Sequence, residues 1–473
     1  TTTTTTTTTL SSNSGKDSSS STQKKDSNES SFVVVDDVPK GDPKVFCADD
    51  LVNLDRDYGD TWWIYRENSS TLTTTTSSSR ASSSTQKRRS SPTRKTQKSR
   101  QKVSVNTIRA IDQHHPLVIC HTLTHRGSTM GLCWSSCGNM LASVSNLGDV
   151  KIWSTRDFRL LKTLRDDDEK SIEEFYCARF TPDSSLLFAS GKHQSRQIWC
   201  DEEDDNYCMS GPIKVFDVKT GRVVLKLEQH QEEVLVFKLI QFKGQNYLLS
   251  GSQDGYIIKW RFSSDWLQCF SVTRFNDPGA CMICSLSFLP NCGNRYFLAG
   301  CDEHLKLYDF EYSCLLQVFP DLHSSYVDSV KVIESPIVST KPFGEYLVLT
   351  RGVELIKPES DKSDIPLQPS RCHLRKLTVP KKPNGKWQLE TLRTFEHPDY
   401  KANTWLMRLA TNGRYLLAPT SFGQIFVWNI ATGKIVGILA GHNGEIRDII
   451  FHPTKPYLVS AGDDNNILVY TQK

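Results

Sequence analysis

The stretch GHNGEIRDIIFHPTKPYLVSAGDDNNILVY, residues 441–470, recurs in altered form along the chain. It opens on Gly-His, ends on an aromatic residue and carries Gly, Asp and Asn shortly before that end. Residues 230–260, HQEEVLVFKLIQFKGQNYLLSGSQDGYIIKW, keep the same order, and aligning Trp260 with Tyr470 also aligns their turn aspartates. Both stretches are typical of short alternating strands separated by tight turns.

Five other stretches carry parts of this pattern, and the copy at 324–378 departs furthest from it. They are residues 125–153, 173–217, 280–309, 324–378 and 403–429. A single small β unit cannot bury its apolar face alone, so a repeat of this kind indicates an array of stacked units. The sequence predicts seven of them.

The repeat resembles that of the WD40 family, in which units of about 40–45 residues form four-stranded blades that begin near Gly-His and end on Trp-Asp. The resemblance covers residues 113–473 and implies an all-β fold, a seven-bladed WD40 β-propeller. No Trp-Asp pair occurs, and the nearest match is Trp428-Asn429. Insertions near residues 193–210 and 357–370 lengthen two of the units.

A closed ring needs a joint, because an open sheet edge leaves its N–H and C=O groups unpaired. The run LVICHTL, residues 117–123, precedes the first copy and has no unit of its own. We therefore expect it to form the outer strand of the last blade.

The N-terminal part has a different composition. Residues 1–112 are rich in Ser and Thr, hold 17 basic and 13 acidic residues, and thereby account for the net charge of +4. So few apolar residues cannot offset chain entropy, which predicts a disordered tail. It contains an acidic segment (36–60) and a basic segment (80–109). The basic segment predicts a nuclear localisation signal, or non-specific contact with nucleic-acid phosphates, centred on Lys87, Arg88 and Arg89.

The 14 cysteines follow no spaced framework and often lie inside apolar runs, which favours free thiols in a reducing compartment. Cys281 and Cys284 form a CxxC, but an odd offset on a strand sends the two thiols to opposite faces. No apolar run is long enough for a membrane helix, and no signal peptide is visible. We expect a nuclear protein, with a cytoplasmic pool as the alternative, that is not secreted and has no membrane contact.

A propeller of this family implies a protein-interaction scaffold within a multi-subunit complex and not an enzyme. The sequence has no nucleophile elbow, no zinc-protease motif and no phosphate-binding loop. We expect no cofactor and no metal.

Three short segments narrow the expected ligand. EFYCA (174–178), YVDSV (326–330) and TWLMRLA (404–410) resemble the embryonic ectoderm development (EED) subunits of Polycomb complexes. That resemblance implies a chromatin complex and a top face that reads trimethylated lysine of a histone tail through an aromatic cage. A quaternary ammonium donates no hydrogen bond, so aromatic faces supply the attraction.

The resemblance places two cage positions on Tyr176 and Trp405 and the other two on Met130 and Leu406. Because two positions are not aromatic, Tyr326 is a candidate substitute. The alternative is that Tyr176 and Trp405 begin their inner strands and pack between blades.

Two other functions stay open. One is a substrate receptor of a cullin-type ubiquitin ligase, because WSTR (153–156) resembles the Trp-Asp-x-Arg box of such receptors and predicts an adaptor contact through Trp153 and Arg156. The other is a general scaffold in RNA processing or trafficking.

Overall fold

The computed structural model describes the following residues: 117–165, 172–193, 211–302, 304–334, 344–354, 369–382 and 385–472. The chain divides into two units, 1–39 and 40–473, and all of the described residues belong to the second. The predicted tail, with its acidic and basic segments and Lys87, Arg88 and Arg89, lies outside them. The described residues form β-strands and no α-helix. Accordingly, they include no helix with the length and apolarity of a membrane span.

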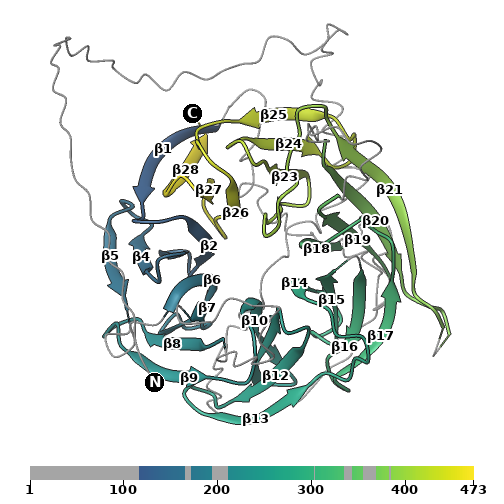
Figure 1. Ribbon diagram of the computed structural model, residues 1–473, viewed down its shortest axis with the longest axis horizontal. Coiled ribbons are helices and arrows are strands. Elements are labelled where there is room, and N and C mark those ends of the chain that lie inside the picture. Colours follow the sequence, from purple (N-terminus) through teal and green to yellow (C-terminus); the bar gives the residue numbers. More distant parts are fainter. Residues whose placement is uncertain are drawn as a thin grey trace, which may run out of the picture. The chain divides into compact units, whose positions relative to one another are not determined.

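The strands form seven antiparallel sheets of four, here called blades A to G (Figure 1). Blades A and B contain β2 (Thr129–Trp134), β3 (Met140–Ser145), β4 (Val150–Ser154) and β5 (Leu160–Leu164), then β6 (Ile172–Phe180), β7 (Leu186–His193), β8 (Ile213–Asp217) and β9 (Val223–Leu227). Blades C and D contain β10 (Val234–Phe242), β11 (Gln245–Ser252), β12 (Ile257–Phe262) and β13 (Cys269–Arg274), then β14 (Ile283–Phe288), β15 (Tyr296–Cys301), β16 (Leu305–Asp309) and β17 (Cys314–Phe319).

The remaining three blades complete the ring. Blades E and F contain β18 (Ser329–Glu334), β19 (Glu345–Arg351), β20 (Arg371–Thr378) and β21 (Gln388–Glu396), then β22 (Ala410–Thr411), β23 (Tyr415–Pro419), β24 (Ile425–Asn429) and β25 (Ile435–Leu439). Blade G contains β26 (Ile446–Phe451), β27 (Tyr457–Gly462), β28 (Asn466–Gln472) and β1 (Leu117–Thr124). The first strand of each blade lies nearest the centre and the fourth lies at the rim (Figure 1). The prediction of seven blades is confirmed.

Ring closure also follows the prediction from the sequence. β1 pairs with β28 in antiparallel register, from Leu117 opposite Gln472 to Thr124 opposite Asn466. Leu117 is buried in an apolar cluster shared with blade F, whereas Leu123 is buried in one shared with blade A. The outermost strand of blade G therefore contributes to the core on both sides of that blade.

The core lies between neighbouring blades. Clusters of buried side chains mix residues from adjacent sheets; Phe216 of blade B, for example, packs with Val144 of blade A. The strands are apolar on both faces because each sheet is covered on both sides. Small buried residues such as Ala142 and Ala189 let these sheets approach closely.

A side-chain network ties the turn between the second and third strands to the loop before the first strand. In blade C, His230 Nδ1 lies 2.9 Å from Asp254 Oδ2 and His230 Nε2 lies 2.8 Å from Ser250 Oγ. Trp260 Nε1 donates to the same hydroxyl over 2.8 Å. Blade G repeats this network with His442, which lies 2.9 Å from Asp464 and 2.7 Å from Ser460.

Blade A lacks one member of the network. His125 Nε2 lies 2.6 Å from Ser143 Oγ, and Trp153 donates to that oxygen. Leu147, which is 49% exposed, stands where blades C and G carry the aspartate. Consequently, His125 Nδ1 is buried without a hydrogen-bond partner in the described part of the chain.

Blade E, whose sequence diverges furthest, keeps the network with three of its four members replaced. His323 Nδ1 lies 2.9 Å from Glu354 Oε1, and His323 Nε2 lies 3.3 Å from Thr350 Oγ1. Arg375 Nε donates to Thr350 Oγ1 over 3.3 Å and so takes the place of the indole. The strand register supports this equivalence. Thr350 pairs with His373, and Arg375 lies two positions after that partner. Ser250 pairs with Ile258, and Trp260 likewise lies two positions after its partner.

Candidate functional site

The loops that this network fixes share one end of the strands, here called the top face. It consists of the turn between the second and third strands of each blade and the loop that leads into the first strand. Two features gather there, an apolar cluster at the axis and a pocket between blades C and D.

The apolar cluster, here called the central plug, joins residues that enter from five blades: Met130, Tyr176, Leu235, Met282 and Leu406. Each lies at or beside the first strand of a different blade, and these strands surround the centre (Figure 1). The plug therefore covers the axis of the propeller. Tyr176 is 5% exposed and Leu406 is 2% exposed, so both side chains are core residues of this cluster.

Arg408 reaches across the axis next to the plug. Its Nη1 donates to the carbonyl oxygen of Met130 over 2.6 Å, and its Nη2 donates to that of Tyr176 over 3.0 Å. The guanidinium also lies 4.0 Å from Asp448 of blade G. One side chain of the blade F segment thus satisfies backbone acceptors in blades A and B.

The interior near Arg408 carries further positive charge. Burial is the main reason that the pKa of Lys331 is lowered to about 8; Asp448 opposes this shift, and Arg179 and Arg408 contribute to it. The cations of Lys331, Arg179 and Arg408 therefore lie close enough to the Asp448 carboxylate to interact electrostatically.

Trp405 lies on a tightly held loop of the top face and is 37% exposed. Arg351 donates to the carbonyl oxygens of Ala402 and, over 2.7 Å, Thr404. Arg447 donates to the carbonyl oxygen of Trp405 itself over 3.1 Å. The backbone hydrogen bonds therefore fix the loop while the indole faces solvent.

A buried ion pair anchors this loop from below. Arg351 pairs with Asp328, both with side chains fully buried, and Asp328 Oδ2 accepts the backbone N–H of Met407 over 3.2 Å. Burial raises the pKa of Asp328 even though Arg351 opposes that shift. Leu406 has a φ of 54°, a strained value for a residue with a branched side chain. The loop stores strain next to its exposed tryptophan.

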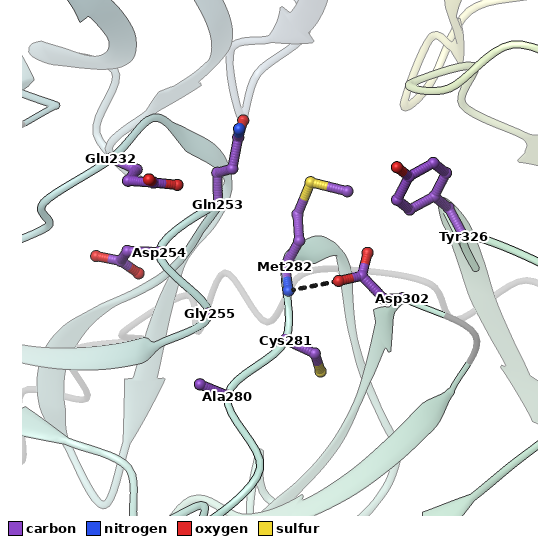
Figure 2. A pocket seen from close by; sticks show the side chains of 9 residues that line it. All are labelled: Glu232, Gln253, Asp254, Gly255, Ala280, Cys281, Met282, Asp302 and Tyr326. Atoms are coloured by element: carbon purple, nitrogen blue, oxygen red, sulfur yellow. Dashed lines mark hydrogen bonds between the residues drawn. The ribbon is translucent and has the colours of Figure 1, made fainter. Parts of the chain in front are cut away.

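The pocket has a volume of about 380 Å³ and opens between blades C and D (Figure 2). Its lining consists of Glu232, Gln253, Asp254, Gly255, Ala280, Cys281, Met282, Asp302 and Tyr326. Asp254 is engaged by His230, and Asp302 Oδ2 accepts the N–H of Met282 over 3.2 Å. Three carboxylates therefore face a space that also contains a thioether and a phenol ring.

Of the five residues predicted to bind a peptide, Trp405, Leu406 and Tyr326 lie in loops of the top face, whereas Met130 and Tyr176 lie within β2 and β6. Met130, Tyr176 and Leu406 meet in the central plug, whereas Tyr326 lines the pocket. Met282 belongs to both features and joins them. Trp405 precedes Leu406, so the exposed indole is adjacent in sequence to the plug.

Sequence reasoning missed Arg408, Arg351 and Met282. The signal for Arg408 was a lone cation inside the apolar run TWLMRLA. Met282 had no distinguishing signal, because its importance comes from the meeting of five inner strands.

The residues of the predicted ligase-adaptor contact lie elsewhere. Trp153 is 6% exposed and its Nε1 donates to Ser143 Oγ, so its indole belongs to the network of blade A. Arg156 is exposed in the turn that follows β4, at the end of the strand opposite the top face.

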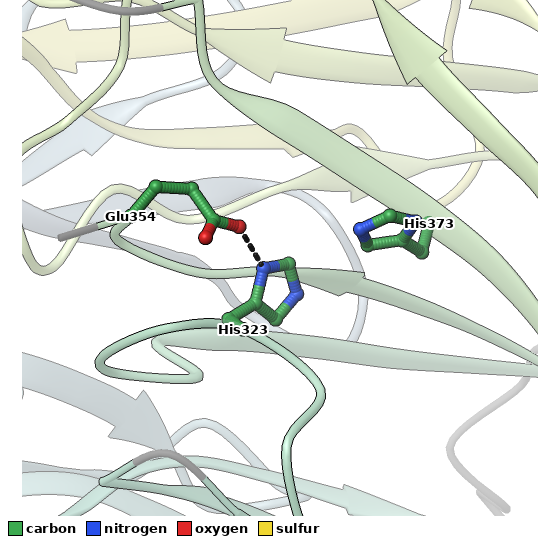
Figure 3. A group of neighbouring side chains, drawn as sticks. All are labelled: His323, Glu354 and His373. Carbon is green, nitrogen blue, oxygen red and sulfur yellow. Dashed lines mark hydrogen bonds and ion pairs between the residues drawn. The ribbon is translucent and has the colours of Figure 1, made fainter. Parts of the chain in front are cut away.

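His323, Glu354 and His373 offer a group of possible metal ligands within 4.8 Å of one another (Figure 3). Both nitrogens of His323 are already engaged in the blade E network. Burial would raise the pKa of Glu354, but hydrogen bonds from His323 and Ser324 lower it to about 2. Since the guanidinium of Arg375 joins the same network, the group acts as a structural tie.

Comparison with known proteins agrees with the fold. The model of the WD domain, G-beta repeat, matches residues 117–154 and 433–471. Protein tipD of Dictyostelium discoideum is 21% identical over 353 residues, which are 73% of this chain and 47% of tipD. LEC14B protein of Lithospermum erythrorhizon is 22% identical over 280 residues, 58% of this chain and 48% of that protein.

A shorter match is to the meiotic recombination protein rec14 of Schizosaccharomyces pombe, 34% identical over 59 residues, 12% of this chain and 20% of rec14. The chain thus spans half or less of the length of each of these relatives. The two segments that match the repeat model contain β1 and β28, the strands that pair to close the ring. From its seven closed blades and these matches, the chain belongs to the WD40-repeat family of β-propellers, whose members bind protein partners in complexes and are generally not catalysts.

Proposed function

We propose that this propeller is a non-catalytic scaffold of a nuclear, chromatin-associated complex. Its top face binds a basic peptide, and the ligand that we propose is a histone tail. The observation that carries the proposal is the rigid presentation of Trp405 beside the central plug. Large exposed aromatics on a fixed backbone are the usual anchors of protein interfaces.

The loop around Trp405 supports a binding role. Its carbonyl oxygens are held by Arg351 and Arg447, so little conformational entropy is lost when a ligand packs on the indole. Trp405 is 37% exposed, so part of its side chain is open to a ligand. Phe422 is 58% exposed in the turn after β23, and in the same turn the Ser421 hydroxyl oxygen lies 3.1 Å from that of Thr404, the residue before Trp405.

The pocket supports a basic ligand. Glu232, Asp254 and Asp302 supply negative charge, which attracts Lys and Arg side chains. Met282 and Tyr326 offer apolar surface for the methylene stem of such a side chain. For a trimethylated lysine, Trp405 and Tyr326 are the aromatic faces available among the predicted positions.

The proposal is tested by fluorescence anisotropy with labelled histone-tail peptides, each unmodified or trimethylated at one lysine. We expect Trp405→Ala to weaken binding by about tenfold or more, as loss of an aromatic anchor does. The matched control is Leu161→Ala, since Leu161 is 55% exposed on β5 at the rim. Equal affinity of the wild type and Trp405→Ala overturns the proposal, and equal affinity for both peptide forms removes methyl-lysine recognition from it.

Nuclear localisation is part of the proposal and has its own test. The basic run Lys87, Arg88 and Arg89 supports it. A tagged protein with all three residues changed to Ala should move to the cytoplasm while its peptide affinity stays unchanged. Retention in the nucleus removes this run from the proposal.

The second candidate function is that of a substrate receptor of a ubiquitin ligase. The exposed position of Arg156 supports it, because an adaptor could contact this side chain. Because Arg156 lies opposite the top face, Arg156→Ala separates the two candidates. Loss of co-purification with a ligase adaptor, with peptide binding intact, supports the receptor; an unchanged set of partners contradicts it.

A further inference from the structure

The segment directly after β19, here called the blade E turn (352–354), lies against the loop of Tyr326. The N–H of Val353 donates to the carbonyl oxygen of Tyr326 over 2.9 Å. A Cβ atom added to Gly352 would lie 2.5 Å from the same oxygen, so a side chain at this position would force the two segments apart. The turn therefore fixes the backbone of a residue that lines the pocket between blades C and D (Figure 2).

The same turn is joined to the loop of Trp405 by a reciprocal pair of hydrogen bonds. Glu354 donates its N–H to Asn403 Oδ1 over 2.7 Å, and Asn403 Nδ2 donates to the carbonyl oxygen of Glu354 over 2.8 Å. Asn403 is partly buried and lies two positions before Trp405. Its side-chain amide thus uses a donor and an acceptor to bind one residue of the neighbouring blade.

The blade E network holds the turn from its other side. Glu354 Oε1 lies 2.9 Å from His323 Nδ1 (Figure 3). Glu354 Oε2 accepts the N–H of Ser324 over 3.2 Å and the hydroxyl of Ser324 over 2.7 Å. The carboxylate and the backbone of Glu354 are therefore both engaged, and a continuous chain of hydrogen bonds runs from His323 through Glu354 to Asn403.

We propose that Asn403 is a positioning residue of the peptide site, and that the blade E turn sets the spacing between Tyr326 and Trp405. Consecutive residues of that turn, Val353 and Glu354, bind the two loops that carry these aromatic side chains. Loops fixed before a ligand arrives lose less conformational entropy when it binds, which raises the affinity. This role rests on the proposed function, because Asn403 acts on the ligand only through Trp405.

The first measurement needs no ligand. Hydrogen–deuterium exchange of the full chain compares the wild type with Asn403→Ala, which removes both hydrogen bonds to Glu354. We expect the amides of residues 402–407 to exchange about tenfold faster in the variant, because the loop opens more often once it is not tied to the blade E turn. Unchanged exchange in these residues overturns the proposal.

Asn412 supplies a matched control in the same blade. Its Oδ1 accepts the N–H of Arg414 over 3.1 Å and the N–H of Tyr415 over 2.9 Å, in the turn between β22 and β23 at the end of the strands opposite the top face. Asn412→Ala therefore also removes two hydrogen bonds of an asparagine side chain. It should leave exchange of residues 402–407 unchanged, and an equal increase in both variants overturns the specific role of Asn403.

The second measurement is affinity by fluorescence anisotropy, with the trimethylated histone-tail peptide that the wild type binds most tightly. Asn403→Ala should weaken binding about fivefold, whereas Asn412→Ala should stay within about twofold of the wild type. Because Asn403 acts through Trp405, the double variant Asn403→Ala/Trp405→Ala should bind no more weakly than Trp405→Ala alone. Losses that multiply in the double variant overturn the positioning role.

Failure of the proposed function and failure of this role give different results. If the wild type binds none of the peptides, the proposed function is wrong, and the exchange measurement still decides whether Asn403 fixes the loop. If Trp405→Ala weakens binding but Asn403→Ala binds like the wild type, the proposed function stands and the positioning role of Asn403 is overturned.

Discussion

Arg408 Nη2 lies 3.0 Å from the carbonyl oxygen of Tyr176, although the two residues are 232 positions apart in sequence and enter from blades F and B. The same guanidinium donates to Met130 of blade A. A propeller is held mainly by contacts between neighbouring blades, whereas this side chain joins blades that are not neighbours. It therefore fixes the inner strands on which the top face is built.

Replacing Arg408 should destabilise the whole ring. Arg408→Met leaves the carbonyl oxygens of Met130 and Tyr176 without these donors, at a cost of about 2–4 kcal/mol in the free energy of unfolding. Urea denaturation measures this change. The matched control is Arg371→Ala, which breaks an exposed ion pair with Glu396 and should cost less than about 1 kcal/mol. Equal stability of Arg408→Met and the wild type would contradict the bridging role.

Completing the network of blade A should stabilise the protein. Leu147→Asp puts a carboxylate where blades C and G carry Asp254 and Asp464, and this carboxylate accepts a hydrogen bond from His125 Nδ1. We expect a gain of about 1 kcal/mol in the free energy of unfolding, measured in urea. Leu147→Ala serves as the control and should give no gain. A loss of stability in Leu147→Asp would show that the loop of blade A does not align with the others.

The closing strand should behave as core. Leu123→Ala empties a buried site between blades G and A and should cost about 2–5 kcal/mol. Thr122→Ala, at an exposed position on the same strand, should change the free energy of unfolding by less than about 0.5 kcal/mol. If both variants melt at the wild-type temperature, β1 is not part of the cooperative fold.

Stability should fall as the pH drops from about 6.5 toward 4. Burial lowers the pKa of His125 to about 3 and that of His452 to about 4. In this window both are neutral when folded and protonated when unfolded, so unfolding takes up protons and becomes more favourable. Each contributes up to about 1.4 kcal/mol per pH unit. His452→Gln should reduce the slope of unfolding free energy against pH, and an unchanged slope would contradict the assignment.

The fold was readable from the sequence because each blade repeats its own local pattern. Turns rich in Gly, Asp and Asn and the alternating strands between them can be recognised within a few residues. The run at 117–123 was recognisable as the closing strand because it belongs to none of the seven repeat units. Blade E was harder to read, since Glu354, Thr350 and Arg375 replace three network residues. These residues make equivalent hydrogen bonds, but they are different residue types, so the repeat pattern is hard to recognise in the sequence of blade E.

The site was only partly readable because it is assembled by ring closure. Met130, Leu235 and Met282 meet in the central plug only after three blades have taken their places around one axis. No local pattern encodes that meeting.

The most direct test of the account is hydrogen–deuterium exchange of the full chain with and without a short peptide rich in Lys and Arg that carries one trimethylated lysine. If the top face is the binding surface, the peptide slows exchange in residues 402–407 and 280–283 and leaves the turn at 155–159, at the opposite ends of the strands, unchanged. Protection confined to residues 155–159, or no protection at a saturating peptide concentration, would contradict it.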